Sequence, residues 1–174
     1  TAVRDPAVVT AGHERVLRAR LADARFFWDE DRKRALVDRV HDLQGVIFLA
    51  KLAEPTMRDK ADRLEYIGRR LATRFGADSL RVDRAAELCK ADLTTLMVQE
   101  FPDLQGLMGG YYAKHDGQDP VVVDAITKHY WPKGAGSPLP DSAEAAVLAV
   151  ADRLDTLAAG FACGLKPTGS KDAY

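Results

Sequence analysis

Residues 88–109 read LCKADLTTLMVQEFPDLQGLMG, and this stretch sets charged residues inside an otherwise apolar segment. Lys90, Asp92 and Glu100 stand among leucine, methionine and phenylalanine residues. Burying such charges is costly unless each is paired with an opposite charge or hydrogen-bonded. The stretch therefore predicts either a functional site or a buried polar network.

Elsewhere, apolar residues recur every three or four positions, which is typical of helices that share a core. The only apolar run with a strand-like composition is residues 46–49. We therefore expect an all-α fold. The expected helices cover residues 12–28, extended by a second helix over 32–43, then 57–75, 82–101, 120–130 and the stretch after Asp141.

Turn-forming and capping residues separate these helices. Gly76 is well placed to stop the helix that precedes it. Asp141, with Glu144 three residues later, predicts a capping box at the start of the last helix. Residues 130–140 hold three prolines and two glycines and predict a loop. Residues 106–112 predict a tight bend.

Composition bounds the class of protein. With 174 residues, of which 47% are hydrophobic and 29% charged, the chain is large enough for one globular domain with a full core. The formal net charge of −1 excludes a broad basic field, so any contact with RNA requires a local patch. No run of residues is long and apolar enough for a membrane span or a signal peptide.

The two cysteines indicate a reducing compartment. Cys89 and Cys163 lie in apolar helical surroundings and form neither a CxxC pair nor a dense disulfide framework. We expect both to be buried thiols in a soluble, cytosolic protein with no membrane partner.

Four stretches together resemble one family. They are residues 88–109, quoted above, GHERVLRARLADARFFW at 12–28, ADRLDTL at 151–157 and PTGSKD at 167–172. In this order they resemble the β subunit of the bacterial two-subunit glycyl-tRNA synthetase, and the match runs from about residue 5 to the end of the chain. Because that subunit is several times longer, the chain is expected to be a fragment of it.

The resemblance implies a part in glycine–tRNA ligase. That enzyme joins glycine to tRNA(Gly) through an ATP-derived adenylate, with magnesium acting at the ATP, and this chemistry belongs to the α subunit. The β subunit supports tRNA binding and the α/β heterotetramer. Residues 1–174 look like its single degenerate HD-type domain, a helical HD-domain-like bundle with no cofactor of its own.

The HD-type resemblance rests on residues that are spread over three expected helices. Metal-dependent HD enzymes combine imidazoles with carboxylates, because both bind the divalent ion that activates water. Here lysine and alanine stand where the histidines are expected, which argues against a metal site. The degenerate HD positions are Asp59, Lys60, Lys90, Ala91, Asp92, Asp152 and Asp155.

Two interpretations of these positions remain open. In the favoured one, the lysine ammonium groups replace the metal and pair with the aspartates, which gives a salt-bridged core. In the other, the domain is an HD-like phosphohydrolase with unusual ligands. The four histidines have no metal-ligand spacing and are expected at the surface or at helix ends; they are His13, His41, His115 and His129.

The arginines of the first helix are the candidate RNA-binding residues. Their planar guanidinium groups suit phosphate. Acidic residues interleave with them, so a solvated helix face is the alternative, and a scaffold domain that touches no RNA is the functional alternative. The candidates are Arg15, Arg18, Arg20 and Arg25.

Two glycine-containing stretches give only weak signals for phosphate binding. Neither residues 106–112 nor residues 168–171 have the spacing of a phosphate-binding loop. We interpret the second as an exit turn into a following domain, at a place that can touch the partner subunit.

Overall fold

The computed structural model describes residues 6–165 and is all-α, as predicted. Within this range the only β feature is an isolated bridge between Ile47 and Thr56. None of the helices in the described range is long and apolar enough to cross a membrane. The elements, with η for a 3-10 helix, are α1 (Pro6–Asp31), η1 (Val37–Gly45), α2 (Met57–Phe75), α3 (Ser79–Leu88), η2 (Ala91–Thr94), α4 (Leu96–Glu100), η3 (Pro102–Leu104), α5 (Leu107–His115), α6 (Pro120–Lys128) and α7 (Ala143–Ala162).

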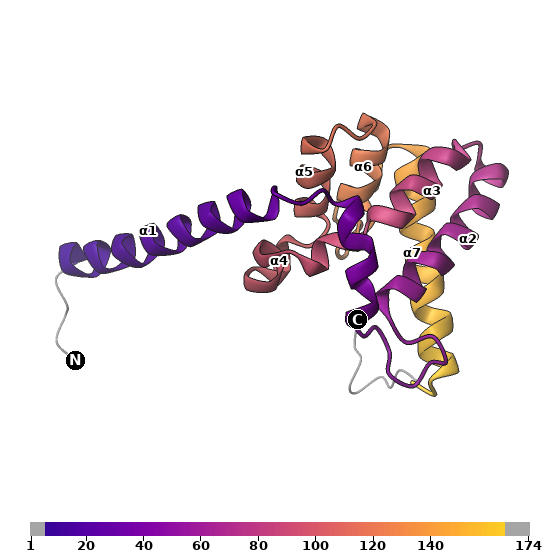
Figure 1. The fold of residues 1–174 in the computed structure, drawn as a ribbon, viewed down its shortest axis with the longest axis horizontal. Coiled ribbons are helices and arrows are strands. Elements are labelled where there is room, and N and C mark those ends of the chain that lie inside the picture. The colour runs from indigo at the N-terminus through magenta and orange to yellow at the C-terminus, as the bar shows by residue number, and fades with distance from the viewer. Residues whose placement is uncertain (1–5, 166–174) are drawn as a thin grey trace.

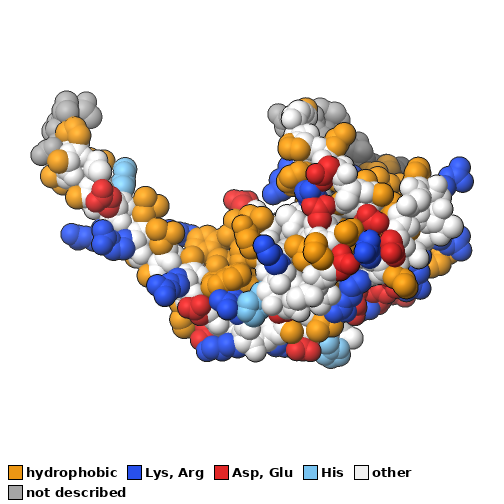
Figure 2. Space-filling view, turned by 90° about the horizontal axis from the view of Figure 1, so that it is seen from above, with side chains coloured by type: hydrophobic (Ala, Val, Ile, Leu, Met, Phe, Trp, Pro, Cys, Tyr) orange, Lys and Arg blue, Asp and Glu red, His pale blue; other side chains and the backbone are white. Residues whose placement is uncertain are grey.

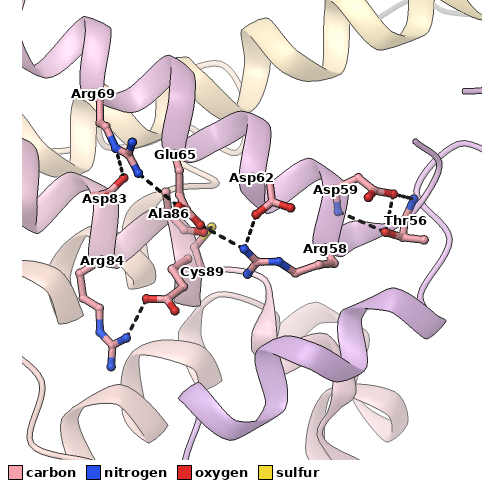
Figure 3. Close-up of polar contacts among 11 residues, drawn as sticks. Thr56, Arg58, Asp59, Asp62, Glu65, Arg69, Asp83, Arg84, Ala86 and Cys89 are labelled. Atoms are coloured by element: carbon pink, nitrogen blue, oxygen red, sulfur yellow. Dashed lines mark hydrogen bonds and ion pairs between the residues drawn. The ribbon is translucent and has the colours of Figure 1, made fainter. Parts of the chain in front are cut away.

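A body of packed helices carries the core. Helix α2 packs against α3 and α7, and α6 packs against α5 and α7 (Figure 1). Leu64, Leu88 and Leu148 are fully buried where these helices meet. The predicted limits of α2 are confirmed: Thr56 and Asp59 form a capping box at its start, shown in Figure 3, and Gly76 ends it with φ 70°.

Helix α1 projects away from this body (Figure 1). It is longer than the predicted 12–28, and the following segment, η1, is a 3-10 helix rather than the α-helix expected over 32–43. Ala24, Phe27 and Trp28 at its C-terminal end pack against the core. Leu17 and Leu21 are 59% and 69% exposed, so the apolar side chains of α1 pack against the core only at its C-terminal end.

The helix predicted over residues 82–101 is wrong, because the chain breaks there into three short pieces. Helix α3 ends at Leu88, η2 follows, and Thr95 then caps α4 by accepting a hydrogen bond from the Val98 N–H. The carboxylate of Asp31 accepts from the N–H groups of Leu96 and Met97 at 2.9 and 3.0 Å. A buried aspartate 65 residues away thus completes the cap that Thr95 begins.

Two further local predictions need correction. The bend over residues 106–112 is confined to Gly106, with φ 79°, and α5 begins directly after it. The cap of α7 is Ser142 and not Asp141, since the Ser142 side chain accepts from the Ala145 N–H. The Glu144 carboxylate instead accepts from the Asp78 N–H, and Asp141 pairs with Lys128.

Some of the remaining predictions from the sequence are confirmed and others are not. The loop over 130–140 and the helix near 120–130 are confirmed. Cys89 is buried as predicted, whereas Cys163 at the end of α7 is only partly buried. His129 lies at a helix end, which is one of the two positions expected for it, and it is fully buried there. The stretch 167–172 lies outside the described residues.

Candidate functional site

The central feature of the site is a carboxylate on α7 between two buried lysines. Asp152 Oδ1 lies 2.9 Å from Lys90 Nζ and 3.2 Å from Lys60 Nζ. Lys60 comes from the first turn of α2, and Lys90 from the connection between α3 and η2. All three residues are more than nine-tenths buried. The predicted pairing of the lysines with Asp152 is therefore present.

A second carboxylate of α7 continues the cluster one turn later. Asp155 Oδ2 lies 3.0 Å from Lys60 Nζ, and Asp155 Oδ1 accepts from Arg63 Nε at 2.5 Å. The Lys60 ammonium also donates to Thr156 Oγ1 at 2.8 Å. Charged and hydroxyl groups thus compensate both lysines and both aspartates, which meets the condition for burying charge.

Aromatic rings cover the two ammonium groups. Lys60 Nζ lies 4.3 Å from the centre of the Phe48 ring, and Lys90 Nζ lies 4.0 Å from that of Tyr130. The face of an aromatic ring attracts a cation, and more strongly when water is excluded. Burial by itself would raise the pKa of Asp152, but Lys90 and Lys60 outweigh it and lower the pKa to about 2. Asp152 is therefore an anion at neutral pH.

Asp92 is held differently from the α7 carboxylates. Its Oδ2 accepts from the backbone N–H groups of Gly106 at 2.6 Å and Gly109 at 3.0 Å, rather than from a lysine. A Cβ at position 109 would stand 3.1 Å from this oxygen, so glycine permits the close approach. Burial raises the pKa of Asp92 to about 6, although the two N–H donors act in the opposite direction. Its predicted pairing with a lysine is not observed.

His129 joins the cluster from the end of α6, and sequence reasoning missed it. Its Nδ1 lies 2.6 Å from the carbonyl oxygen of Ile126, and since a carbonyl can only accept, Nδ1 carries the hydrogen. Burial, followed by the nearby charge of Lys90, lowers the pKa of His129 to about 3. The imidazole is neutral. A buried histidine had no signal in the sequence beyond its apolar neighbours.

The other positions that the sequence singled out by HD-type resemblance lie outside this set of contacts. Asp59 accepts from the N–H and hydroxyl groups of Thr56 and so serves as a helix cap. Ala91 is fully buried at the start of η2. The described residues contain no group of three His, Cys, Asp or Glu side chains that could hold a metal ion. Lysine ammonium groups occupy the side of Asp152 where a cation would bind, so the residues present do not fit a metal.

The predicted arginine strip divides between two faces of α1. Arg20 packs toward α4, with its guanidinium group 3.6 Å from Glu100 and 4.9 Å from the centre of the Phe101 ring. Arg15, Arg18 and Arg25 are exposed and make no ion pair within residues 6–165. Figure 2 shows Lys and Arg side chains along one side of α1 and apolar ones toward the body.

Asp31 fixes the root of α1, and no sequence pattern singled it out. Besides capping α4, its carboxylate accepts from the Tyr112 hydroxyl at 2.9 Å and lies 3.5 Å from Arg39. Trp28 stacks on Tyr112 with ring centres 5.2 Å apart. These contacts join α1, α4 and α5, and they hold the exposed arginines away from the body.

Comparisons with known proteins identify the family. The model of the family described as "Glycyl-tRNA synthetase beta subunit" matches residues 1–174. The glycine–tRNA ligase β subunit of Geobacter sp. (strain M21) is 51% identical over 175 residues, which cover 100% of this chain and 25% of the relative. That of Phenylobacterium zucineum (strain HLK1) is 51% identical over 172 residues, or 97% of this chain and 25% of the relative.

A third relative agrees. The glycine–tRNA ligase β subunit of Acidithiobacillus ferrooxidans (strain ATCC 53993 / BNL-5-31) is 48% identical over 171 residues, covering 98% of this chain and 24% of the relative. The chain thus spans about a quarter of the length of these relatives. The family model, by contrast, matches all 174 residues of this chain. The chain belongs to the glycyl-tRNA synthetase β subunit family.

Proposed function

We propose that this chain is a domain of a cytoplasmic glycine–tRNA ligase and that it helps to bind tRNA(Gly) through the outer face of α1. In this proposal the α subunit is its protein partner and carries the adenylate chemistry, with ATP and magnesium. Family membership supports the first part. The free arginines of α1 support the second.

The observation that carries the RNA proposal is the arrangement of Arg15, Arg18 and Arg25. A spacing of three and then seven residues places them on one side of a helix with 3.6 residues per turn. Arg20 falls on the opposite side, where it pairs with Glu100. Three guanidinium groups without protein partners can each contact a phosphate, and they project from a helix that stands clear of the body.

The buried cluster suggests what the rest of the domain contributes. We propose that it is an HD-type domain in which Lys60 and Lys90 take over the charge compensation that a metal would give. Its carboxylates are engaged by ammonium, guanidinium and backbone N–H groups, so they support the fold rather than hydrolysis of a phosphate ester. A stable body then gives α1 a fixed attachment.

The test is tRNA(Gly) binding by the assembled synthetase across a salt series. The variant Arg15→Ala/Arg18→Ala/Arg25→Ala should bind more weakly, and the slope of log affinity against log salt should become shallower by roughly 2 to 3, since each lost phosphate contact removes about 0.7 to 0.9. The control is Arg70→Ala/Arg74→Ala, which removes two exposed arginines of α2, to be compared with the triple variant per charge removed.

Two results would speak against the RNA proposal. If the triple variant binds as the wild type does, with its helical content intact, the domain acts as a scaffold that touches no RNA. If the α2 control weakens binding as much as the triple variant, the effect reflects the total charge and not the face of α1.

A further inference from the structure

The outer face of α7 is apolar along most of its length. Val150, Leu154, Leu157 and Phe161 are 46%, 47%, 60% and 59% exposed. Their spacing of four, three and four residues places them on one side of the helix. Large apolar side chains scattered singly on a surface are ordinary, but a continuous stripe marks a contact surface.

The charged residues of α7 are all engaged in contacts away from this stripe. The ionisable residues of the helix all have partners elsewhere in the body. Asp152 and Asp155 bind the lysines, and the Glu144 carboxylate accepts from the Asp78 N–H at 3.0 Å. Arg153 donates to the carbonyl oxygens of Tyr130 and Pro132 at 3.2 and 2.9 Å. A nucleic acid needs cationic contacts, so this face does not fit RNA.

Two hollows flank the first half of the stripe. One, of about 380 Å³, lies between α2 and α7 beside Phe75. The other, of about 220 Å³, lies between α7 and the 130–140 loop, beside Leu139. Ala146 and Val150 line both, so the hollows adjoin. Small side chains between larger ones leave room for the apolar side chains of a second helix.

We propose that this face, which we call the α7 stripe, binds an apolar-faced helix from the same β-subunit polypeptide, outside residues 1–174. The relatives are about four times as long as this chain, so most of the polypeptide in such a subunit lies elsewhere. A segment of the same chain meets the stripe at a high effective concentration and needs no charge steering. Beyond the end of α7, Leu165 is also exposed, at 53%.

This inference is independent of the RNA proposal, because α7 and the arginines of α1 lie on different elements. It assigns α7 the role of an internal domain contact. The other possible occupants, a second β subunit and the α subunit, would each cover the stripe only when that partner is present, and this difference decides the test.

The test uses the full-length β subunit with Cys163→Ala, so that the partly buried native thiol at the end of α7 does not react. Leu157→Cys reports on the stripe. Leu80→Cys, at a position 80% exposed in α3, is the matched control. Maleimide labelling of each position is followed by peptide mass spectrometry, for the isolated subunit at a low and a high concentration, with added α subunit, and in urea.

We expect Leu157→Cys in the isolated subunit to react about tenfold or more slowly than Leu80→Cys, at both concentrations, and the two to react alike in urea. Equal native rates would overturn the proposal. So would protection that appears only at the higher concentration, which indicates a second copy, or only after the α subunit is added. Leu157 is exposed within this domain, so the domain is expected to fold in the variant.

Discussion

The two faces of α7 differ from those of a usual surface helix, because buried aspartates lie among the apolar residues of the inner face and large apolar side chains are exposed on the outer face. The inner face carries Asp152 and Asp155, which are 7% and 4% exposed, and the outer face carries Leu154 and Leu157, which are 47% and 60% exposed. The buried charges are acceptable because lysines and an arginine compensate them. Within the described residues, no apolar side chains cover the exposed leucines. The difference indicates that one face of α7 is complete and that the other awaits a partner.

Lysine suits the inner face for two reasons. Its long aliphatic stem packs among apolar side chains while the ammonium group reaches a carboxylate. Each ammonium group here also faces an aromatic ring, of Phe48 or Tyr130. A buried ion pair adds little net stability over a well-packed apolar pair, but it is expensive to break.

The largest effect is expected from removing one of these lysines. Lys90→Met keeps the stem but leaves Asp152 with only the more distant lysine, so unfolding of this chain in urea should show a loss of about 3 to 5 kcal/mol. The matched control is Lys33→Met, because Lys33 pairs with Glu30 at the surface. That loss should stay below about 1 kcal/mol. Equal losses would mean that the buried cluster has no special role.

An intermediate effect on the free energy of unfolding is expected when the pH is lowered, because His129 is buried in its neutral form. The folded state keeps this imidazole neutral, with its pKa near 3, while in the unfolded state it takes up a proton at its ordinary pKa. Its contribution to stability is therefore complete above about pH 6.5 and falls by about 1.4 kcal/mol for each pH unit below it. The change in unfolding free energy caused by His129→Gln should shrink accordingly as the pH falls.

The comparison of wild type with His129→Gln is needed because Asp92 acts with the opposite sign. Its raised pKa favours the protonated folded state, so it adds stability as the pH falls through about 6. Lys90, Asp152 and Lys60 also lie near His129. The pKa of Lys90 is raised and that of Asp152 is lowered to about 2, so these two groups stay charged over this range. A difference between wild type and variant that stays constant from about pH 7 to about pH 4 would contradict the buried neutral histidine.

The smallest effect is expected on the outer face. Leu154→Glu/Leu157→Glu places two charges on the α7 stripe, where they remain in water. The unfolding free energy of this 174-residue chain should change by no more than about 0.5 kcal/mol. The same change in the full-length subunit should be markedly destabilising if another segment covers the stripe. A large loss in the short chain would show that the stripe already packs within this domain.

Local patterns predicted part of this arrangement. The limits of α2 followed from apolar periodicity and from Gly76, which needs only its own backbone freedom to end the helix. The lysine pairs with Asp152 followed from the cost of burying charge.

What the sequence did not predict depends on contacts between distant residues. After the break that follows Leu88, Asp31 helps to cap α4 from the end of α1. Asp92 was expected to pair with a lysine, but it accepts a hydrogen bond from the backbone N–H of Gly106 instead. Arg20 does not share the exposed face of the other arginines, because it contacts Glu100 and Phe101. These two residues come close to Arg20 only in the folded chain.

The central claim is that the carboxylates of α7 are held by lysines as part of the fold. A double-mutant cycle with Lys90→Met and Asp152→Leu tests it directly through unfolding free energies of this chain. We expect a coupling of about 2 to 3 kcal/mol, with the double variant more stable than Lys90→Met alone. Losses that simply add would contradict the claim, because they would show that the two side chains do not stabilise one another.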